Sequence, residues 1–286
     1  MRHASLDAFL ASNAARLRTG PLGLIFVEDG AEIDSTLDHH LRLGFRSLLV
    51  FLPEGLDRAP ATDPRIAEIT LATRTPGLVA ETINRLAAAA PGQWIYYGYN
   101  AEYLYFPFCE SRSIGEMLAF HAEERREAML TYVIDLYPGD LARAPDGVNV
   151  ADAHLDRIGY FAQARPGPDG PRGRQLDFYG GVRWRFEQHI PPVQRRIDRI
   201  ALFRARPGVR LLPDHRFDEE EMNTYSCPWH HNLTAAICSF RTAKALRSNP
   251  VSAEEISGFR WQGSVPFAWS SQQLMELGLM EPGQWF

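Results

Sequence analysis

The chain has 286 residues, of which 45% are hydrophobic and 23% charged, values typical of a globular protein with a sizeable core. Its formal net charge of -5 argues against a general attraction to nucleic acid or to anionic membranes. Three cysteines form no disulfide framework and no apolar run is long enough to span a membrane, so we expect a cytoplasmic protein without a transmembrane segment.

Helical and strand patterns alternate through the first 140 residues. Residues 1–21 carry apolar side chains at helical spacing and predict an N-terminal helix, which lacks the continuous apolar stretch of a signal peptide. Strands are expected at 23–27, 47–52, 66–72, 93–99 and 129–136, and helices at 33–43, 78–90 and 113–124. The periodicity at 66–72 leaves a helix open. The alternation predicts an α/β fold with a mainly parallel sheet flanked by helices.

The second half of the chain is less regular. Residues 164–174 are rich in Pro, Gly and Arg and predict a mobile loop, and residues 179–181 predict a tight turn. A short strand is expected at 200–203 and a strand running into a helix at 234–246. The tail, 247–286, is rich in aromatic residues and is expected to pack against the body of the protein.

An ordered series of short motifs runs through residues 22–246. Glu28 and Asp29 follow the first apolar strand, and the next helix carries His39 and His40. After these come WIYYGYNAEYLYFP at 94–107, VIDLYP at 133–138, GGVR at 180–183, RIALFR at 199–204, His215 and ICSFR at 237–241. In this order the motifs resemble the family-2-like glycosyltransferases of the glycosyl transferase family 2_4 type. The resemblance implies a GT-A-like (nucleotide-diphospho-sugar transferase) domain at 22–246, preceded by the N-terminal helix and followed by the irregular tail.

The resemblance also points to a metal site whose ligands are missing from this sequence. In the family, an Asp-x-Asp turn and a later His hold Mn²⁺ or Mg²⁺ against the diphosphate of the nucleotide sugar, and carboxylate oxygens suit these hard cations. The aligned residues here are Tyr99, Ala101 and Ser239, none of which is a strong ligand. The family therefore implies a nucleotide-sugar donor and a divalent metal, whereas the residues present predict a degenerate metal site.

Two carboxylates are candidates for catalysis. Asp135 lies inside an apolar strand pattern, where a charge is costly unless it is paired, so it is either an active-site base or the structural partner of an arginine. Glu102 follows the degenerate turn and is either a residual ligand or base, or a strand-end carboxylate that makes local hydrogen bonds. The family alignment favours a catalytic role for Asp135, whereas for Glu102 both alternatives stay open.

Further residues are candidates for binding the substrates. Glu28 and Asp29 can hydrogen-bond a base or ribose, with helix N-capping as the alternative. Tyr99 and Asn100 belong to the same expected donor site. Guanidinium groups match phosphate geometry, and we assign Arg183 and Arg241 to the nucleotide, and Arg199 with His215 to the acceptor or diphosphate. The alternative for each arginine is a surface position or an ion pair. The alternative for His215 is a hydrogen-bonded histidine in a loop.

Other clusters of polar residues give weaker evidence for a functional site. Cys227, His230 and His231 match a zinc site poorly, because a tetrahedral site needs four ligands. Of His39 and His40, one is expected to pack inward and the other to face solvent. The glycine-rich segments contain no dinucleotide-binding or P-loop pattern.

Two functions follow from these residues. The first is a hexosyl-type transferase that moves a sugar from a nucleotide-sugar donor to a glycan or other surface acceptor, without the usual Asp-x-Asp metal site. The alternative is a catalytically degenerate GT-A-fold binding or regulatory module. Neither function involves nucleic acid as a partner.

Overall fold

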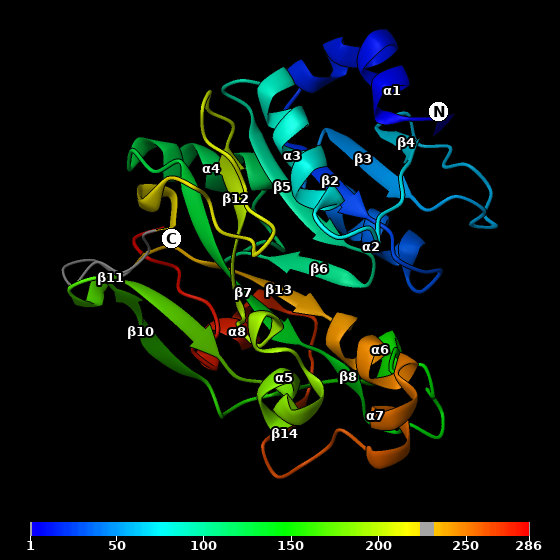
Figure 1. The fold of residues 1–286 in the computed structure, drawn as a ribbon, viewed down its shortest axis with the longest axis vertical. Coiled ribbons are helices and arrows are strands. Elements are labelled where there is room, and N and C mark those ends of the chain that lie inside the picture. The colour runs from blue at the N-terminus through cyan, green and yellow to red at the C-terminus, as the bar shows by residue number, and fades with distance from the viewer. Residues whose placement is uncertain (1, 224–231, 286) are drawn as a thin grey trace. The chain divides into compact units, whose positions relative to one another are not determined.

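The structure is a computed structural model that describes residues 2–223 and 232–285 (Figure 1). Its helices are α1 (Leu6–Asn13), α2 (Ile33–Arg42), α3 (Leu78–Ala89), α4 (Ile114–Glu123), α5 (Val182–Arg185), α6 (Arg241–Ser248), α7 (Pro250–Glu255) and α8 (Ser271–Glu276). The strands of its large sheet are β1 (Arg2–His3), β2 (Leu22–Phe26), β3 (Ser47–Leu52), β4 (Ile66–Thr70), β5 (Trp94–Tyr99), β6 (Glu102–Tyr105), β7 (Ala128–Asp135), β12 (Asp198–Arg204) and β13 (Ala235–Ser239). Smaller strands are β8 (Tyr137–Pro138), β9 (Ala153–Asp156), β10 (Phe161–Gly167), β11 (Gly170–Tyr179) and β14 (Ser264–Pro266).

The large sheet has nine strands in the order β1-β4-β3-β2-β5-β12-β7-β13-β6. Strands β1 to β5 pair in parallel, as do β7 and β13, whereas β12 runs antiparallel to β5 and β6 antiparallel to β13. The predicted α/β fold with a mainly parallel sheet and flanking helices is therefore confirmed. At residues 66–72, where the sequence allowed a strand or a helix, the structure has the strand β4.

Contacts divide the chain into two compact units, neither of them continuous in sequence. The first unit comprises Met1–Ala101, Ser111–Leu130 and Ile200–Asn223, and the second comprises Glu102–Glu110, Thr131–Arg199 and Thr224–Phe286. The chain thus leaves and re-enters each unit, and each is described below by itself.

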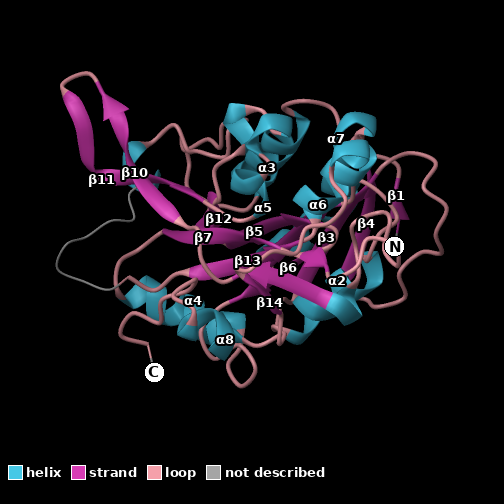
Figure 2. Ribbon diagram, turned by 90° about the horizontal axis from the view of Figure 1, so that it is seen from below, coloured by secondary structure: helices cyan, strands magenta, loops and turns pink. Residues whose placement is uncertain are grey.

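The core of the first unit is built on fully buried strands. All five residues of β2 are buried, and β2 pairs in parallel with β3 on one side and β5 on the other. Strands buried on both faces are expected to read as continuous apolar runs, as β2 and β3 do. Figure 2 shows α3 on one side of these strands and α2 and α4 on the other.

The N-terminal segment belongs to this first unit. Ser5 caps α1, since its hydroxyl accepts a hydrogen bond from the Ala8 amide at 3.1 Å. The helix is followed by a 3₁₀ turn at Ala14–Arg18, and it is preceded by β1, which pairs in parallel with β4.

In the second unit, three adjacent strands place polar residues in one row. β7 pairs in parallel with β13, and β13 pairs antiparallel with β6. In this register Ser239 lies opposite Asp135 on one side and opposite Glu102 on the other. In the tail, Phe267 and Trp285 are buried, and their rings lie against Tyr105 and Phe106.

The loop predicted at residues 164–174 is wrong, because this segment forms most of a β-hairpin. β10 and β11 pair antiparallel, and Gly167 lies opposite Gly170 across the turn. Gly170 marks the turn, where it adopts a φ of 117° that side-chain-bearing residues avoid, whereas Pro166, Pro171 and Gly173 lie within the two strands. Arg165 is held in the hairpin by ion pairs, so its charge does not indicate a solvent-exposed loop.

The prediction that one histidine of the pair on α2 faces solvent is also wrong. His39 and His40 are both buried, at 8% and 0% exposure. The His40 ring stacks on Tyr96 with its centroid 5.0 Å away, and its Nδ1 lies 2.7 Å from the Thr36 carbonyl oxygen. Adjacent residues on a helix point about 100° apart, which leaves room for both on a broad buried face.

Candidate functional site

The first candidate site lies where the chain of the first unit changes direction across the sheet. From β2 the chain moves to β3 and β4 on one side, whereas β5 lies on the other side of β2. Open α/β sheets bind ligands outside the carboxyl ends of the strands that flank such a switch point. Glu28, Asp29 and Asn100 follow the ends of β2 and β5, so the structure brings these three predicted residues together.

Asn100 organises this site. Its side chain is fully buried, and its Oδ1 accepts a hydrogen bond from the Glu28 amide at 2.9 Å. Its Nδ2 donates to Asp29 Oδ1 at 2.7 Å and to the Ala31 carbonyl at 2.8 Å. Because one buried amide bonds three successive parts of the loop, the loop after β2 is held in a fixed shape beside the end of β5.

The two positions aligned with Asp-x-Asp are occupied by packed residues. Tyr99 is 3% exposed, and its ring centroid lies 6.1 Å from that of Phe26. Ala101 is fully buried with a φ of 59°, and its amide donates to Thr36 Oγ1 at 2.9 Å. A positive φ is uncommon for alanine, so this hydrogen bond supports a strained turn.

The second candidate site is the row of Glu102, Ser239 and Asp135 in the second unit. Asp135 is 1% exposed, and its carboxylate accepts hydrogen bonds from Arg183 Nη2 at 2.8 Å and from Thr242 Oγ1 at 2.8 Å. The Arg183 backbone amide also donates to Asp135 Oδ2 at 3.0 Å. A Cβ on Gly181 would lie 3.2 Å from Oδ2, and the φ of 67° there favours glycine, so the predicted tight turn brings Arg183 close to Asp135.

Glu102 has an equivalent partner. Its Oε2 lies 2.6 Å from Arg199 Nη2, and its Oε1 accepts a hydrogen bond from Ser239 Oγ at 3.0 Å. Glu102 and Arg199 are 1% and 5% exposed. Ser239 Oγ in turn accepts from the backbone amide of Arg241, at 3.2 Å. Ser239 therefore contributes hydrogen bonds to the row.

The structure pairs the predicted catalytic carboxylates with predicted phosphate-binding arginines. Asp135 binds Arg183 and Glu102 binds Arg199, and each pair is buried. The sequence analysis gave pairing with an arginine as one alternative for Asp135, and Arg183 is that arginine. The Arg241 side chain is half-buried at the start of α6.

His215 belongs to the first unit and contacts Tyr97 of the same unit, 118 residues earlier in the chain. Its Nδ1 is 3.1 Å from the hydroxyl of Tyr97, and the two rings stack with centroids 5.8 Å apart. Tyr97 lies on β5, two residues before Tyr99. This contact matches the alternative given for His215 in the sequence analysis, a hydrogen-bonded histidine in a loop.

No family model and no curated protein matches this chain. The resemblance to family-2-like glycosyltransferases therefore stays a prediction. Within residues 2–223 and 232–285, no group of three or more His, Cys, Asp or Glu side chains is arranged to hold a metal ion. No helix in the described ranges is both long and apolar enough to cross a membrane. Cys227, His230 and His231 lie outside the described residues.

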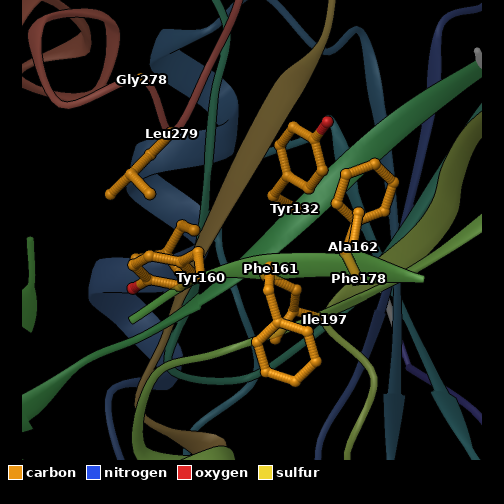
Figure 3. A pocket seen from close by; sticks show the side chains of 9 residues that line it. Tyr132, Tyr160, Phe161, Ala162, Phe178, Ile197, Gly278 and Leu279 are labelled. Atoms are coloured by element: carbon orange, nitrogen blue, oxygen red, sulfur yellow. The ribbon is translucent and has the colours of Figure 1, made fainter. Parts of the chain in front are cut away.

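A third feature, a pocket in the second unit, was not predicted. Its volume is about 270 Å³, and four aromatic residues line it together with aliphatic side chains from β7, from β10, from Ile197 just before β12 and from the segment after α8 (Figure 3). These aromatic residues are Tyr132, Tyr160, Phe161 and Phe178. Phe161 also lines a second depression of about 260 Å³. The sequence pattern predicts a loop at 164–174 and therefore gives no signal that the flanking aromatic residues share a surface.

A buried polar network around Asp156 was also missed. Asp156 is 1% exposed and accepts hydrogen bonds from Arg185 Nε at 2.7 Å, from Trp261 Nε1 at 2.8 Å and from the hydroxyl of Tyr137. Burial, reinforced by the Asp156 carboxylate, raises the pKa of Tyr137 above its usual value. A neutral tyrosine donor and a paired arginine satisfy the carboxylate, which indicates a structural role.

Proposed function

We propose that the chain is a glycosyltransferase-like protein that binds a nucleotide sugar at the carboxyl ends of β2 and β5 and transfers the sugar to a glycan or other surface acceptor. The observation that carries the proposal is the loop at the switch point, fixed by Asn100 and bearing Glu28 and Asp29. The Asp29 carboxylate, which Asn100 holds, and the Glu28 carboxylate on the same loop can accept hydrogen bonds from the hydroxyls of a ribose or the N–H groups of a base.

The proposed reaction does not use an Asp-x-Asp metal. Transfer breaks the bond between the sugar C1 and the diphosphate, and it forms a bond from C1 to an acceptor oxygen whose proton passes to a carboxylate base or to water. Tyr99 and Ala101 offer no ligand chemistry for a hard cation, so we expect other groups to stabilise the leaving diphosphate.

Calorimetric titration of the full chain with UDP, GDP, ADP and CMP, each with and without Mn²⁺, tests this proposal. We expect one nucleotide to bind with the same affinity in both conditions. Glu28→Gln should weaken that binding by about tenfold, equivalent to about 1.4 kcal/mol, since it removes one charged acceptor. Glu54→Gln is a matched control, because Glu54 is exposed in a loop of the same unit. Absence of nucleotide binding would overturn the proposal, and tightening by Mn²⁺ would overturn its metal-free form.

A second candidate is a binding module on the same fold that lacks turnover. The burial of Glu102 and Asp135 in ion pairs favours it, because carboxylate oxygens bonded to an arginine are less available to contact a substrate. If nucleotide binds, release of sugar from the donor separates the two functions. Turnover that Asp135→Asn and Glu102→Gln both reduce supports the enzyme, whereas binding without turnover supports the module.

A further inference from the structure

Three aromatic side chains meet at the surface of the second unit, beside the β10–β11 hairpin. Phe161 and Trp184 are 39% and 41% exposed, although most large apolar side chains of the described chain are buried. The Phe161 ring stacks on Tyr179 with centroids 5.3 Å apart and planes 19° apart. Trp184 meets Phe161 edge-on at 6.0 Å. Adjoining exposed aromatic rings commonly mark a binding surface.

Polar side chains surround these rings. Gln163, Glu187 and Arg195 line the same depression, whose volume is about 260 Å³. Glu187 and Arg195 form an ion pair at 3.1 Å, and Arg195 also donates to the Ile190 carbonyl at 2.9 Å. The arginine charge is therefore neutralised within the depression. Within the described ranges, neither the indole N–H of Trp184 nor the side-chain amide of Gln163 has a hydrogen-bond partner.

We propose that this depression binds a neutral saccharide. One face of a sugar ring presents C–H groups that carry a small positive charge, and an aromatic face carries the complementary negative charge. The sugar hydroxyls then meet the indole N–H, the amide of Gln163 and the carboxylate of Glu187, which can donate to them or accept from them. A phosphate-bearing ligand fits less well, because Arg195 is already paired.

The backbone around Trp184 is fixed by groups already described. The adjacent Arg183 binds Asp135 through its amide and its side chain, so the short helix α5 is anchored to β7. Gly159 passes under the indole with a φ of 91°, and a Cβ there would touch the ring at 3.4 Å. Trp184 is thus positioned before any ligand binds, which reduces the entropy lost on binding.

This inference goes beyond the proposed function, since saccharide binding requires neither nucleotide nor transfer. The test is calorimetric titration of the full chain, without nucleotide, with three neutral trisaccharides: maltotriose, cellotriose and chitotriose. We expect at least one to bind, and we expect Trp184→Ala to weaken it by about tenfold, the upper range for an aromatic contact of about 1.4 kcal/mol. Trp184→Phe should restore part of the loss, and Gln163→Leu should weaken binding by a smaller factor.

Leu212→Ala serves as the control, because Leu212 is 40% exposed and lies in the first unit. It should leave trisaccharide affinity unchanged. Nucleotide affinity, measured on the same variants, should be unchanged by Trp184→Ala and reduced by Glu28→Gln, so the two proposals can fail separately. The saccharide proposal is overturned if no trisaccharide binds at millimolar concentration, if Trp184→Ala binds as the parent does, or if the variant loses nucleotide binding instead.

Discussion

At the scale of single residues, two buried carboxylates, Asp135 and Glu102, each pair with an arginine from a distant part of the chain. A carboxylate within an apolar strand is costly unless it is paired, and this identified Asp135 from the sequence. The partner was not identifiable, because Arg183 is 48 residues away along the chain. Glu102 and Arg199, 97 residues apart, were each predicted for a different role. Sequence spacing carries no signal for such contacts, since they form only when distant strands pair.

The buried pair of Glu102 and Arg199 leads to a stability prediction. Glu102→Gln keeps the size of the side chain but removes the negative charge with which the buried Arg199 pairs. We expect the free energy of unfolding to fall by about 3–5 kcal/mol, measured by urea denaturation. Glu127→Gln is the matched control, since Glu127 and its partner Arg206 are 35% and 38% exposed and such pairs contribute about 0.2–1 kcal/mol. Equal losses in the two variants would contradict the prediction.

His121, on α4, predicts a dependence of stability on pH. Burial lowers its pKa from 6.5 to about 4, and the nearby Arg126 acts in the same direction. Above pH 6.5 the imidazole is neutral in both states and contributes no pH dependence. As the pH falls from 6.5 to 4, the unfolded chain takes up the proton first, so stability should decrease by up to about 3 kcal/mol.

Urea denaturation of the parent and of His121→Gln between pH 7 and pH 4.5 checks this expectation. Glutamine can still donate to the Ala128 carbonyl, which accepts from the imidazole at 3.0 Å. Between pH 6.5 and pH 5, where few carboxylates titrate, the free energy of unfolding should fall much less in the variant than in the parent. The same slope in both proteins would assign the pH dependence to other groups.

At the scale of elements, strands and helices with strong periodicity were predicted well and the hairpin was not. The apolar runs of β2, β3 and β5 have no other stable environment than a sheet interior, so local pattern was enough. In β10 and β11, exposed positions and glycines removed the alternation that marks a strand. Arg165 is buried there and forms ion pairs with Asp177 at 2.6 Å and with Asp198 at 3.2 Å. The sequence pattern does not reveal these contacts.

Arg165 therefore provides a test of what holds the hairpin. Arg165→Met keeps the length of the side chain and removes its charge, so Asp177 and Asp198 lose one of their arginine partners and keep Arg196. We expect a loss of about 3 kcal/mol in the free energy of unfolding. Arg143→Met, at a site 83% exposed, should change it by less than about 0.5 kcal/mol. An unchanged midpoint for Arg165→Met would show that the strand pairing alone holds the hairpin.

At the scale of the whole molecule, ligand binding should stabilise the folded chain. A nucleotide that binds only the folded state, at about 100 times its dissociation constant, raises the free energy of unfolding by about 2.7 kcal/mol. Thermal unfolding with the nucleotide identified by calorimetry should therefore shift to higher temperature. Chelation by EDTA should leave this shift unchanged, whereas Glu28→Gln should reduce it. A shift abolished by EDTA would indicate a metal in the nucleotide complex.

The sequence alone determined the α/β class, the positions of most strands and helices, and which polar residues follow the strands. These properties depend on the periodicity of neighbouring side chains and on the cost of charge in apolar surroundings, both of which are local. Only the tertiary structure decided that Asn100 fixes the loop carrying Glu28 and Asp29, and that Glu102 and Asp135 each bind a distant arginine. It also decided that Phe161, Tyr179 and Trp184 share one surface. The physical reason is that these contacts join strands and turns far apart in the chain, and their partners are chosen by strand order and register.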